Sequence, residues 1–257
     1  MQYFGNSNKE DIHAVGLVFE PNFFRLNYYG DREAQKLIGT EEVAYGSEPE
    51  VKELSNLYPL YALTFNAHYT LMPNDLFDED QAQKILAFNT ESKSPNVDWN
   101  SDPTNQAKII FERDIHSEQY LDSLFPGLQL RHGVHALLSY SRNFKLSNLL
   151  TILAKSGEKY TLAVFQNGKT KFINTIDAKH IEDVIYFLLY TLKTLDIGVK
   201  TPLILLGVSP DDNGLKTSLE KYLTSVSKSS PVSTNLPISE EEVAANWIGV
   251  HASLCAL

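Results

Sequence analysis

The stretch LLTILAKSGEKYTLAVFQNGKTKFINTIDAKHIEDVIYFLLYTLKTLDIGVKTPLILLGV, residues 149–208, decides the fold of this chain. Apolar, β-branched runs at 149–154 and 160–166 predict two strands, and a third is expected directly after Asn167-Gly168. Apolar residues between Ile181 and Leu195 then recur at i, i+3, i+4 and i+7, the spacing of one face of a helix. The run at 203–206 predicts a buried strand. The order is therefore three strands, a long amphipathic helix and a fourth strand.

The Asn167-Gly168 pair also predicts a register for the hairpin. A two-residue type I′ turn needs positive φ at both central residues, which this pair tolerates. Pairing across the turn places three pairs of residues opposite one another: Phe165 with Thr170, Ala163 with Phe172, and Leu162 with Ile173. Apolar side chains coincide on the shared faces in this register, which supports it.

The first half of the chain carries an approximate copy of the same order. Residues 14–19 and 23–29 predict two strands that flank a turn at Glu20-Pro21-Asn22. A third strand is expected within 33–45, a short helix at 48–57 and a buried strand at 60–65. Hairpins followed by alternating helices and strands imply mixed sheets covered by helices. We therefore expect an α/β protein with mixed sheets and an internal duplication.

A run of three acids, Asp78-Glu79-Asp80, precedes an expected helix at 81–88. A metal site is one interpretation of such a run. The other is a helix start, since Asp is a favoured N-cap and anions suit the first turn. We prefer the helix start, and we predict no metal site in this chain.

Residues 90–106 are polar, with a lone Trp99, and predict a surface loop or an insertion that contacts something. Ser117 is expected to be the N-cap of a following helix. The remaining expected elements are strands at 107–111 and 128–130, and helices at 117–125, 133–142, 213–223 and 239–247. A Ser- and Pro-rich loop is expected at 225–237.

Composition narrows the classes of function. The chain has 257 residues, a formal net charge of −10 and one cysteine, Cys255. An acidic chain repels phosphate backbones, so we expect no nucleic-acid binding. One cysteine excludes a disulfide framework within the chain and Cys₄ or Cys₂His₂ zinc sites. The N-terminus, residues 1–11, has no apolar core of a signal peptide, and no apolar run in the chain has the length of a membrane span. We therefore expect a cytoplasmic protein without direct membrane insertion.

With these elements in order, the chain resembles an uncharacterised bacterial family, a domain of unknown function assigned to the actin-like ATPase superfamily. The resemblance is carried by three stretches: YTLMPNDLFDE at 69–79, LFPG at 124–127 with the following Arg131-His132, and the block 169–195 with Gly207. It implies an actin-like ATPase fold, with two ribonuclease-H-like halves around a cleft. The halves are expected at 1–147, including the polar loop 90–106, and at 148–257.

The resemblance also says where a nucleotide would bind. Actin-like ATPases hold the phosphates with a strand–turn–strand that carries Asp-x-Gly in each half, and the adenosine with a glycine-rich loop after a strand. Aspartates organise magnesium there, and glycines let backbone N–H groups approach the anion. The candidate nucleotide-binding residues at the matching positions are Glu20 and Asn22 in the first turn, Ser156 and Gly157 in the second, and Gly207 and Ser209 in the adenosine loop.

These positions depart from the family pattern. The first turn contains Pro21, which has no N–H to offer, and neither turn contains Asp-x-Gly. The sequence therefore favours a non-catalytic actin-like scaffold or binding protein with a degenerate nucleotide site, no cofactor and no catalytic residues. A more distant likeness to the actin-like proteins of pilus and secretion platforms, which work largely by binding partners, makes a protein partner the expected ligand.

Two alternatives stay open. One is an ATPase or phosphotransferase that uses Mg-ATP in the cleft between the halves, with a carboxylate such as Glu20 or Glu158 near the magnesium. The other is a self-assembling filament, which follows from analogy of fold alone.

Overall fold

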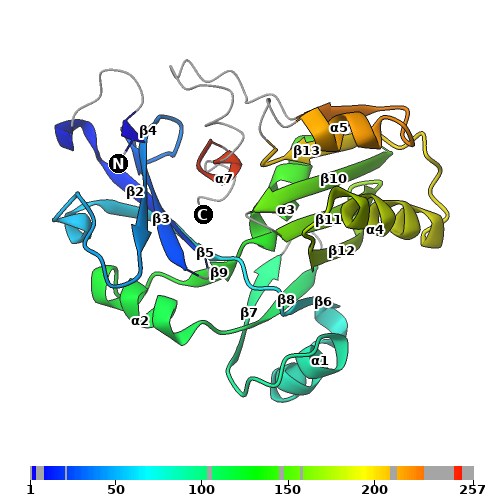
Figure 1. Cartoon of the computed structure of the whole chain (residues 1–257). Helices are drawn as coiled ribbons and strands as arrows, with labels where there is room; N and C mark the ends of the chain where they lie inside the picture. Colours follow the sequence, from blue (N-terminus) through cyan, green and yellow to red (C-terminus); the bar gives the residue numbers. More distant parts are fainter. Residues whose placement is uncertain are drawn as a thin grey trace. The chain divides into compact units, whose positions relative to one another are not determined.

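The structure is a computed structural model that describes residues 2–3, 9–20, 22–102, 106–144, 148–156, 159–208, 213–228 and 246–250 (Figure 1). The chain divides into two compact units. Unit 1 comprises Met1–Ser139 and Ala252–Leu257, and unit 2 comprises Tyr140–His251. The expected boundary of the halves between residues 147 and 148 stays a prediction.

Unit 1 is built on a six-stranded mixed sheet. Its order is β1-β4-β3-β2-β5-β9. The strands are β1 (Gln2–Tyr3), β2 (Ala14–Phe19), β3 (Phe23–Tyr29), β4 (Leu37–Ala44), β5 (Tyr58–Thr64) and β9 (Leu130–His132). Strands β2, β3 and β4 are antiparallel neighbours, whereas β5 is parallel to both β2 and β9. The expected strands at 14–19, 23–29, 33–45 and 60–65 are confirmed.

Unit 2 repeats this arrangement with five strands. Its order is β12-β11-β10-β13-β14. The strands are β10 (Leu149–Ser156), β11 (Lys159–Gln166), β12 (Lys169–Asp177), β13 (Leu203–Leu206) and β14 (Val226–Lys228). The first three are antiparallel, and β13 is parallel to both β10 and β14. Apart from β1, both sheets have the order third, second, first, fourth, fifth strand, so the internal duplication is confirmed.

The hairpin register in unit 2 is confirmed at its turn and wrong beyond it. Asn167 and Gly168 have φ of 53° and 73°, as a type I′ turn requires, and Phe165 pairs with Thr170. A bulge next to Phe165 leaves Lys171 without an opposed residue and shifts the pairing by one position. The pairs beyond the bulge are therefore Ala163 with Ile173 and Leu162 with Asn174.

A small three-stranded sheet is inserted in unit 1 between β5 and α2 (Ile115–Leu124). Its order is β6-β8-β7, with β6 (Tyr69–Pro73), β7 (Val97–Asp102) and β8 (Ala107–Glu112) all antiparallel. The predicted loop 90–106 is therefore wrong over β7. Its prolines lie outside the strand, and Trp99 packs on Phe77 with ring centroids 5.4 Å apart. Pairing with β8 stabilises β7 as a strand, although the polar sequence of β7 gives no local sign of it.

The helices largely follow the predictions. They are α1 (Ala82–Asn89), α2, α3 (Val134–Ser141), α4 (Ile181–Thr194), α5 (Asn213–Leu219) and α7 (Trp247–Val250). Residues 229–245 lie outside the described part of the chain, so the predicted helix at 239–247 stays a prediction. Within the described ranges, no helix is long and apolar enough to cross a membrane. The predicted helix at 48–57 is wrong, because only a single 3₁₀ turn forms there, at Leu54–Asn56. A segment this short is marginal as an isolated helix.

Two acidic side chains cap helical segments. Asp78 accepts a hydrogen bond from the backbone N–H of Asp80 and begins the 3₁₀ turn that leads into α1, so the helix-start interpretation is confirmed. Asp114, and not Ser117, is the N-cap of α2, since its carboxylate accepts from the Ser117 N–H. The Ser117 hydroxyl donates to the same carboxylate and is fully buried.

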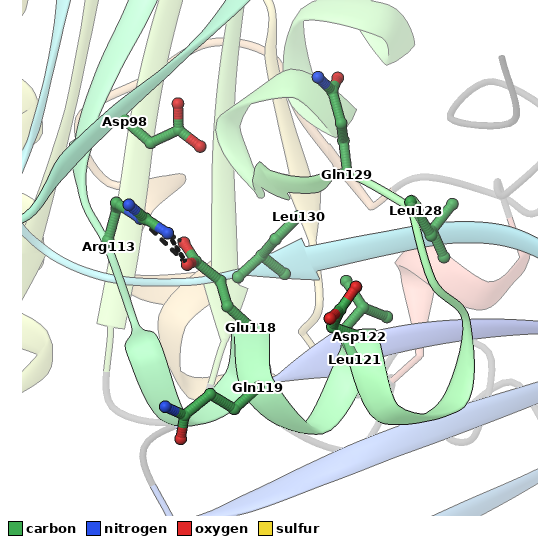
Figure 2. A pocket seen from close by; sticks show the side chains of 10 residues that line it. Asp98, Arg113, Glu118, Gln119, Leu121, Asp122, Leu128, Gln129 and Leu130 are labelled. Atoms are coloured by element: carbon green, nitrogen blue, oxygen red, sulfur yellow. Dashed lines mark hydrogen bonds and ion pairs between the residues drawn. The ribbon is translucent and has the colours of Figure 1, made fainter.

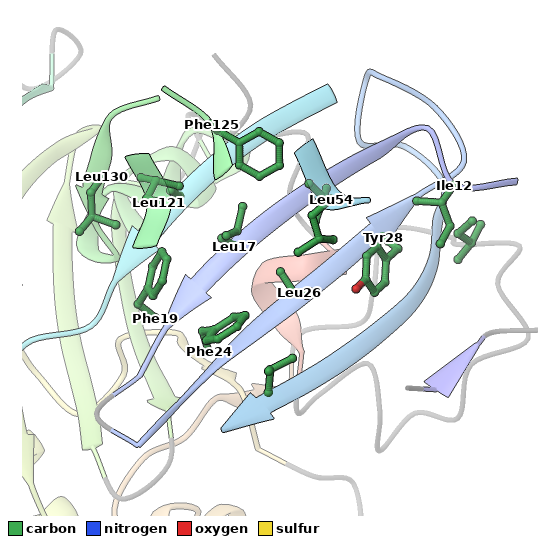
Figure 3. Packing of buried hydrophobic residues seen from close by; sticks show 14 residues of the cluster. Ile12, Leu17, Phe19, Phe24, Leu26, Tyr28, Leu54, Leu121, Phe125 and Leu130 are labelled. Carbon is green, nitrogen blue, oxygen red and sulfur yellow. The ribbon is translucent and has the colours of Figure 1, made fainter. Parts of the chain in front are cut away.

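Each unit has its own apolar core. In unit 1, alternate residues of β2 and β3, including Leu17, Leu26 and Tyr28, pack with Leu121 and Phe125 from α2 and its C-cap (Figure 3). In unit 2, α4 and α5 cover one face of the sheet through the apolar stripe that the helical spacing predicted. These cores hold the carboxyl ends of the parallel strands of each sheet in register.

Candidate functional site

The turn between β2 and β3 holds the first two candidate residues, Glu20 and Asn22. The Glu20 N–H donates to the Phe23 carbonyl oxygen at 2.9 Å, and the Tyr45 hydroxyl donates to the Glu20 carbonyl oxygen at 2.9 Å. Asn22 is exposed, and Pro21 lies outside the described residues. The backbone of Glu20 is therefore committed to contacts within the chain on both its donor and its acceptor side.

The Tyr45 hydroxyl is held in its protonated form beside this turn. Burial raises the pKa of Tyr45, a contact with Ser117 lowers it, and the negative charges of Asp114 and Glu20 raise it further. The net direction is upward, so the hydroxyl stays a hydrogen-bond donor at neutral pH. The Tyr45 side chain is therefore bonded to the backbone of the first turn, a tertiary contact that no local sequence pattern predicts.

In unit 2 the structure brings Ser156 and Gly207 together. Ser156 ends β10 and Gly207 follows β13, and these two strands are parallel neighbours. Ser156 pairs with Lys159 in the β10–β11 hairpin. Both residues lie at the carboxyl edge of these parallel strands, the edge outside which open α/β sheets bind their ligands. The other two candidates of this half, Gly157 and Ser209, lie outside the described residues.

Gly207 is required by packing within unit 2. Its φ is +70°, and a Cβ atom there would lie 2.1 Å from the Lys155 carbonyl oxygen and 3.2 Å from Cδ1 of Trp247. The glycine that we matched to the adenosine loop therefore approaches backbone and an indole ring of its own chain. Close backbone approach is a common reason for glycine at a strand end.

A similar contact occurs at the carboxyl edge of the unit 1 sheet. The Gly133 N–H donates to the Thr64 carbonyl oxygen at 2.8 Å, and a Cβ on Gly133 would lie 2.2 Å from the Phe65 ring. Phe65 follows β5, and its N–H donates to the Phe19 carbonyl oxygen at 3.3 Å. An aromatic ring thus covers a glycine next to the first turn, which sequence reasoning missed because residues 65 and 133 are distant in the chain.

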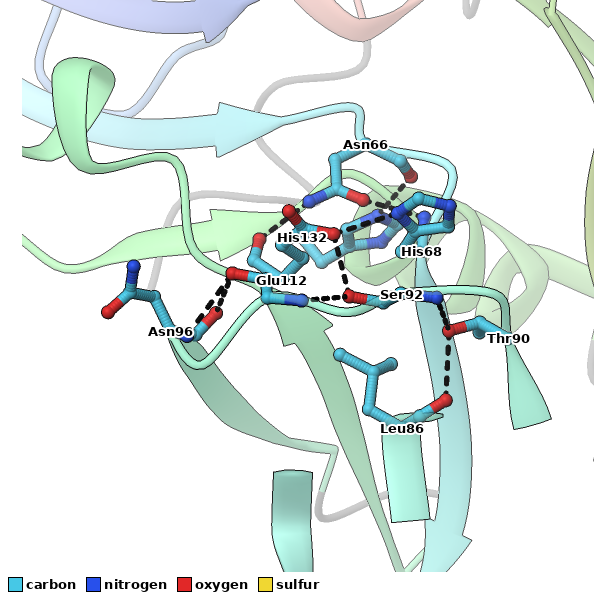
Figure 4. A network of polar contacts seen from close by, with 9 residues as sticks. Asn66, His68, Leu86, Thr90, Ser92, Asn96, Glu112 and His132 are labelled. Carbon is cyan, nitrogen blue, oxygen red and sulfur yellow. Dashed lines mark hydrogen bonds and ion pairs between the residues drawn. The ribbon is translucent and has the colours of Figure 1, made fainter. Parts of the chain in front are cut away.

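A polar network lies nearby in unit 1 (Figure 4). Oε2 of Glu112 accepts from the Ser92 hydroxyl at 2.8 Å and lies 2.7 Å from Nδ1 of His68. These residue types also make hydrolytic triads, but there the serine bonds to the histidine. Here both bond to one carboxylate oxygen, so the arrangement fastens the segment around Ser92 to the end of β8.

His132 extends this network in a neutral form. Its Nδ1 accepts from the Val134 N–H at 3.3 Å, so Nε2 carries the proton that is donated to the Asn66 carbonyl oxygen at 2.9 Å. Both ring nitrogens are therefore occupied. Among the residues that the structure describes, no three His, Cys, Asp or Glu side chains are grouped to hold a metal ion.

A pocket of about 420 Å³ lies in unit 1 between the insertion and α2 (Figure 2). Asp98 of β7 and the ion pair between Arg113 and Glu118 line one part of it. Nε of Arg113 donates to the two carboxylate oxygens of Glu118 at 2.9 and 3.0 Å. No motif in the sequence marks this pocket, because its residues come from separate segments.

The surroundings of Asp98 in the pocket shift the pKa of its carboxyl group. Burial raises the pKa of Asp98 above its ordinary value of 3.8, while a hydrogen bond from the Trp99 N–H and the charge of Arg113 lower it, and the charge of Glu118 raises it. A raised pKa in the folded state means that this state binds more protons than the unfolded chain just above pH 3.8. The ionised carboxylate therefore reduces the free energy of unfolding at neutral pH.

We expect Asp98→Asn to raise the melting temperature at pH 7, because the amide keeps the bond from Trp99 and removes the desolvated charge. The gain should shrink as pH falls through the folded-state pKa and disappear below pH 3.8, where the wild-type carboxyl is protonated in both the folded and the unfolded state. Melting curves of both proteins from pH 3.5 to 7.5 test this. Equal or lower stability of the variant at pH 7 would contradict it.

Comparison with solved structures shows the fold of the chain. A Bacteroides thetaiotaomicron VPI-5482 protein with an actin-like ATPase fold and unknown function superposes with a TM-score of 0.76 at 20% identity, over 97% of this chain and 98% of that chain. The PilM–PilN type IV pilus biogenesis complex gives a TM-score of 0.59 at 13% identity, over 95% and 98%. With the repeated strand order, these matches define an actin-like ATPase fold made of two ribonuclease-H-like halves.

The family follows from the sequence match. A family model described as "Protein of unknown function (DUF3822)" matches residues 55–226, and the chain belongs to this family. The matched range covers the insertion, α2, β9 and most of unit 2. No curated protein matches the chain.

Proposed function

We propose that this protein is a non-catalytic actin-like scaffold that binds another protein, with a nucleotide site that has degenerated. The observation that carries the proposal is the hydrogen bonding of the Glu20 backbone in the β2–β3 turn. A phosphate-binding turn needs backbone N–H groups that face the anion. In this turn the Glu20 N–H is bonded to the Phe23 carbonyl oxygen, and Pro21 has no N–H.

The glycine at the end of β13 supports the same proposal. A glycine in an adenosine loop lets the ligand come close to the backbone. Gly207 instead lies against the Lys155 carbonyl oxygen and Trp247. Atoms of the same chain therefore occupy the space that the missing side chain leaves. Both features favour a protein that keeps the actin-like fold but has lost the turns that bind the phosphates of a nucleotide.

A protein partner is the ligand that this proposal favours. The PilM–PilN complex is an assembly of one protein of this fold with another protein. For the present chain, partner binding also agrees with a net charge of −10, which disfavours nucleic acid.

Titration calorimetry with Mg-ATP tests the degenerate site. We expect no saturable heat at micromolar nucleotide and no rise in melting temperature with millimolar Mg-ATP. A ligand at 100 times its dissociation constant would stabilise the folded state by about 2.7 kcal/mol, an effect that melting curves detect readily. Micromolar binding would remove the main support for the proposal.

The alternative, an ATPase or phosphotransferase, is favoured by one observation. Glu20 follows β2 at the carboxyl edge of the sheet, where a carboxylate can meet bound magnesium. This alternative requires measurable turnover that Glu20→Ala removes. Turnover that is absent, or that Glu20→Ala leaves unchanged, counts against it.

A further inference from the structure

Helix α4 of unit 2 carries two exposed tyrosines on the side that does not pack on its sheet (Figure 1). Val184, Leu188 and Leu192 are buried and pack into the core of unit 2. Tyr186 and Tyr190 lie on the opposite side of the helix and are 70% and 57% exposed. Exposed aromatic residues are enriched at protein–protein interfaces. This side of α4 is therefore a candidate surface for association.

The two tyrosine rings are in contact with one another before any partner binds. Their centroids are 5.9 Å apart and the angle between the ring planes is 18°, which is a stacked arrangement. Residues at i and i+4 are neighbours on a helix surface, so the helix itself sets this contact. Each ring restricts the other, and less side-chain freedom is then lost when a partner packs on the pair.

Opposite charges flank the tyrosine pair. Glu182 and Asp183 lie in the first turn of α4, and Lys193 lies in the last turn. All three side chains are exposed, and no ion pair among the described residues involves them. With 3.6 residues per turn, the three charged residues and the two tyrosines lie within about 100° of one another around the helix axis. They form one continuous face.

The charges are placed symmetrically about the tyrosine pair. At 1.5 Å per residue, Asp183 and Lys193 lie about 7.5 Å on either side of the point midway between Tyr186 and Tyr190. When a second copy of α4 packs antiparallel on this face, its Lys193 is level with Glu182 and Asp183 of the first copy, and the same contact recurs at the other end. A parallel arrangement would instead bring like charges together. The face is thus complementary to itself in the antiparallel arrangement.

The charges alone would not mark an interface. The helix dipole favours acids in the first turn and a lysine in the last turn of any helix. It gives no reason for two exposed tyrosines between them, and Tyr is a weaker helix former than Ala, Glu or Lys. Association explains the tyrosines and the symmetric charges together.

The edge strand of the unit 2 sheet suits a second copy less well. Strand β12 lies at this edge and has a bulge at Lys171. The Thr175 N–H donates to Oδ1 of Asn174 at 2.8 Å. Bulges and lysines are devices that keep edge strands from pairing with another chain. The exposed face of α4 has none of these features.

We propose that two copies of this chain associate through α4, antiparallel about a twofold axis. The tyrosine pairs of the two copies meet at the centre, and Lys193 of each copy faces Glu182 and Asp183 of the other. Both copies use the same face, so the assembly closes at two copies and does not grow into a filament. This proposal goes beyond the scaffold function and does not depend on the nucleotide site.

The dimer is expected to be weak. Since a buried tyrosine contributes 150–250 Å², the exposed fractions of the four rings correspond to roughly 500 Å². Stable complexes bury about 1,200–2,000 Å² in total. We therefore expect a dissociation constant on the order of 100 µM, so that the dimer forms only at high protein concentration.

Sedimentation velocity of the full-length chain from about 5 to about 500 µM tests the proposal, since this range spans the expected dissociation constant. The wild type should shift from monomer to dimer. Tyr186→Ser/Tyr190→Ser should stay monomeric throughout. Lys193→Glu should weaken the dimer about tenfold, because the symmetry makes both charge contacts repulsive. The control Lys93→Glu, at an exposed lysine of unit 1, changes the net charge equally and should leave the dimer unchanged.

A mixture of two charge variants makes the test specific for the antiparallel arrangement. Glu182→Lys/Asp183→Lys alone should also dimerise weakly, because lysine then faces lysine. Mixed in equal amounts with Lys193→Glu, it should form a heterodimer about as tight as the wild-type dimer, because every contact again joins opposite charges. The helix dipole disfavours the double-lysine variant, so circular dichroism checks that it folds. The result for Lys193→Glu stands without it.

Three outcomes would overturn the proposal: a wild-type chain that is monomeric at every concentration, growth beyond two copies, or a mixture that associates no better than the separate variants. Each of them leaves the scaffold proposal standing, since that rests on the β2–β3 turn. Binding of Mg-ATP would overturn the scaffold proposal and leave the association through α4 untouched.

Discussion

Gly207→Ala is expected to destabilise unit 2 by about 3 kcal/mol or more. A left-handed φ costs a non-glycine residue about 1–2 kcal/mol. The added Cβ would also lie 2.1 Å from the Lys155 carbonyl oxygen, so backbone must move, and overpacking of this kind costs roughly 1–3 kcal/mol. The two costs arise together because β13 and β10 are paired on either side of the contact.

Gly168→Ala is the matched control. Gly168 has a φ of +73°, close to that of Gly207, but a Cβ there would meet no atom within 4 Å. Only the backbone cost remains, about 1–2 kcal/mol. Denaturant unfolding of both variants in a Trp99→Phe background, where Trp247 fluorescence alone reports on unit 2, separates the two costs. Equal destabilisation by the two substitutions would show that the contact with Lys155 does not contribute to the loss of stability.

Gly16→Ala is expected to destabilise unit 1 by about 3 kcal/mol. Gly16 lies in the middle of β2, and a Cβ there would be 2.2 Å from Cζ of the Tyr61 ring, which is 3% exposed. The Tyr61 hydroxyl accepts from Nδ2 of Asn27 and bonds to the Tyr29 hydroxyl, both at 2.9 Å. Displacing the ring breaks these bonds and leaves buried polar groups unsatisfied, at about 1–3 kcal/mol, in addition to the overpacking.

A double-mutant cycle isolates this contact. Once Tyr61→Ala has removed the ring, adding Gly16→Ala should cost little, so the two substitutions should be non-additive by about 2 kcal/mol. Unfolding followed by far-UV circular dichroism measures all four proteins. Additive effects would mean that Gly16→Ala acts through something other than Tyr61.

The parts of the fold that the sequence predicts are those with local signals. The positive φ that Asn167-Gly168 supplies and the apolar stripe of α4 each lie within one short segment, and both are confirmed. The bulge at Lys171 has no such signal, because it depends on how β12 meets β11. The sequence of β7 predicts a loop for a similar reason, since the pairing of this strand with β8 is a tertiary contact.

The candidate site residues also divide into features that local sequence predicts and features that depend on tertiary contacts. The sequence places Glu20 and Gly207 at strand ends, because strand boundaries can be predicted. It does not show that Tyr45 bonds to the Glu20 carbonyl oxygen or that Trp247 lies near Gly207. The pocket beside Asp98 draws Asp98, Arg113 and Asp122 from three segments that only the folded chain brings together. No spacing in the sequence marks such a group of residues.

We propose above that this protein keeps the actin-like fold but not the turns that bind the phosphates of a nucleotide. A crystal structure grown with Mg²⁺ and a non-hydrolysable ATP analogue tests it most directly. We predict no ordered triphosphate and an unchanged bond from the Glu20 N–H to the Phe23 carbonyl oxygen. An ordered triphosphate whose oxygens accept hydrogen bonds from the backbone of the β2–β3 turn would contradict the claim.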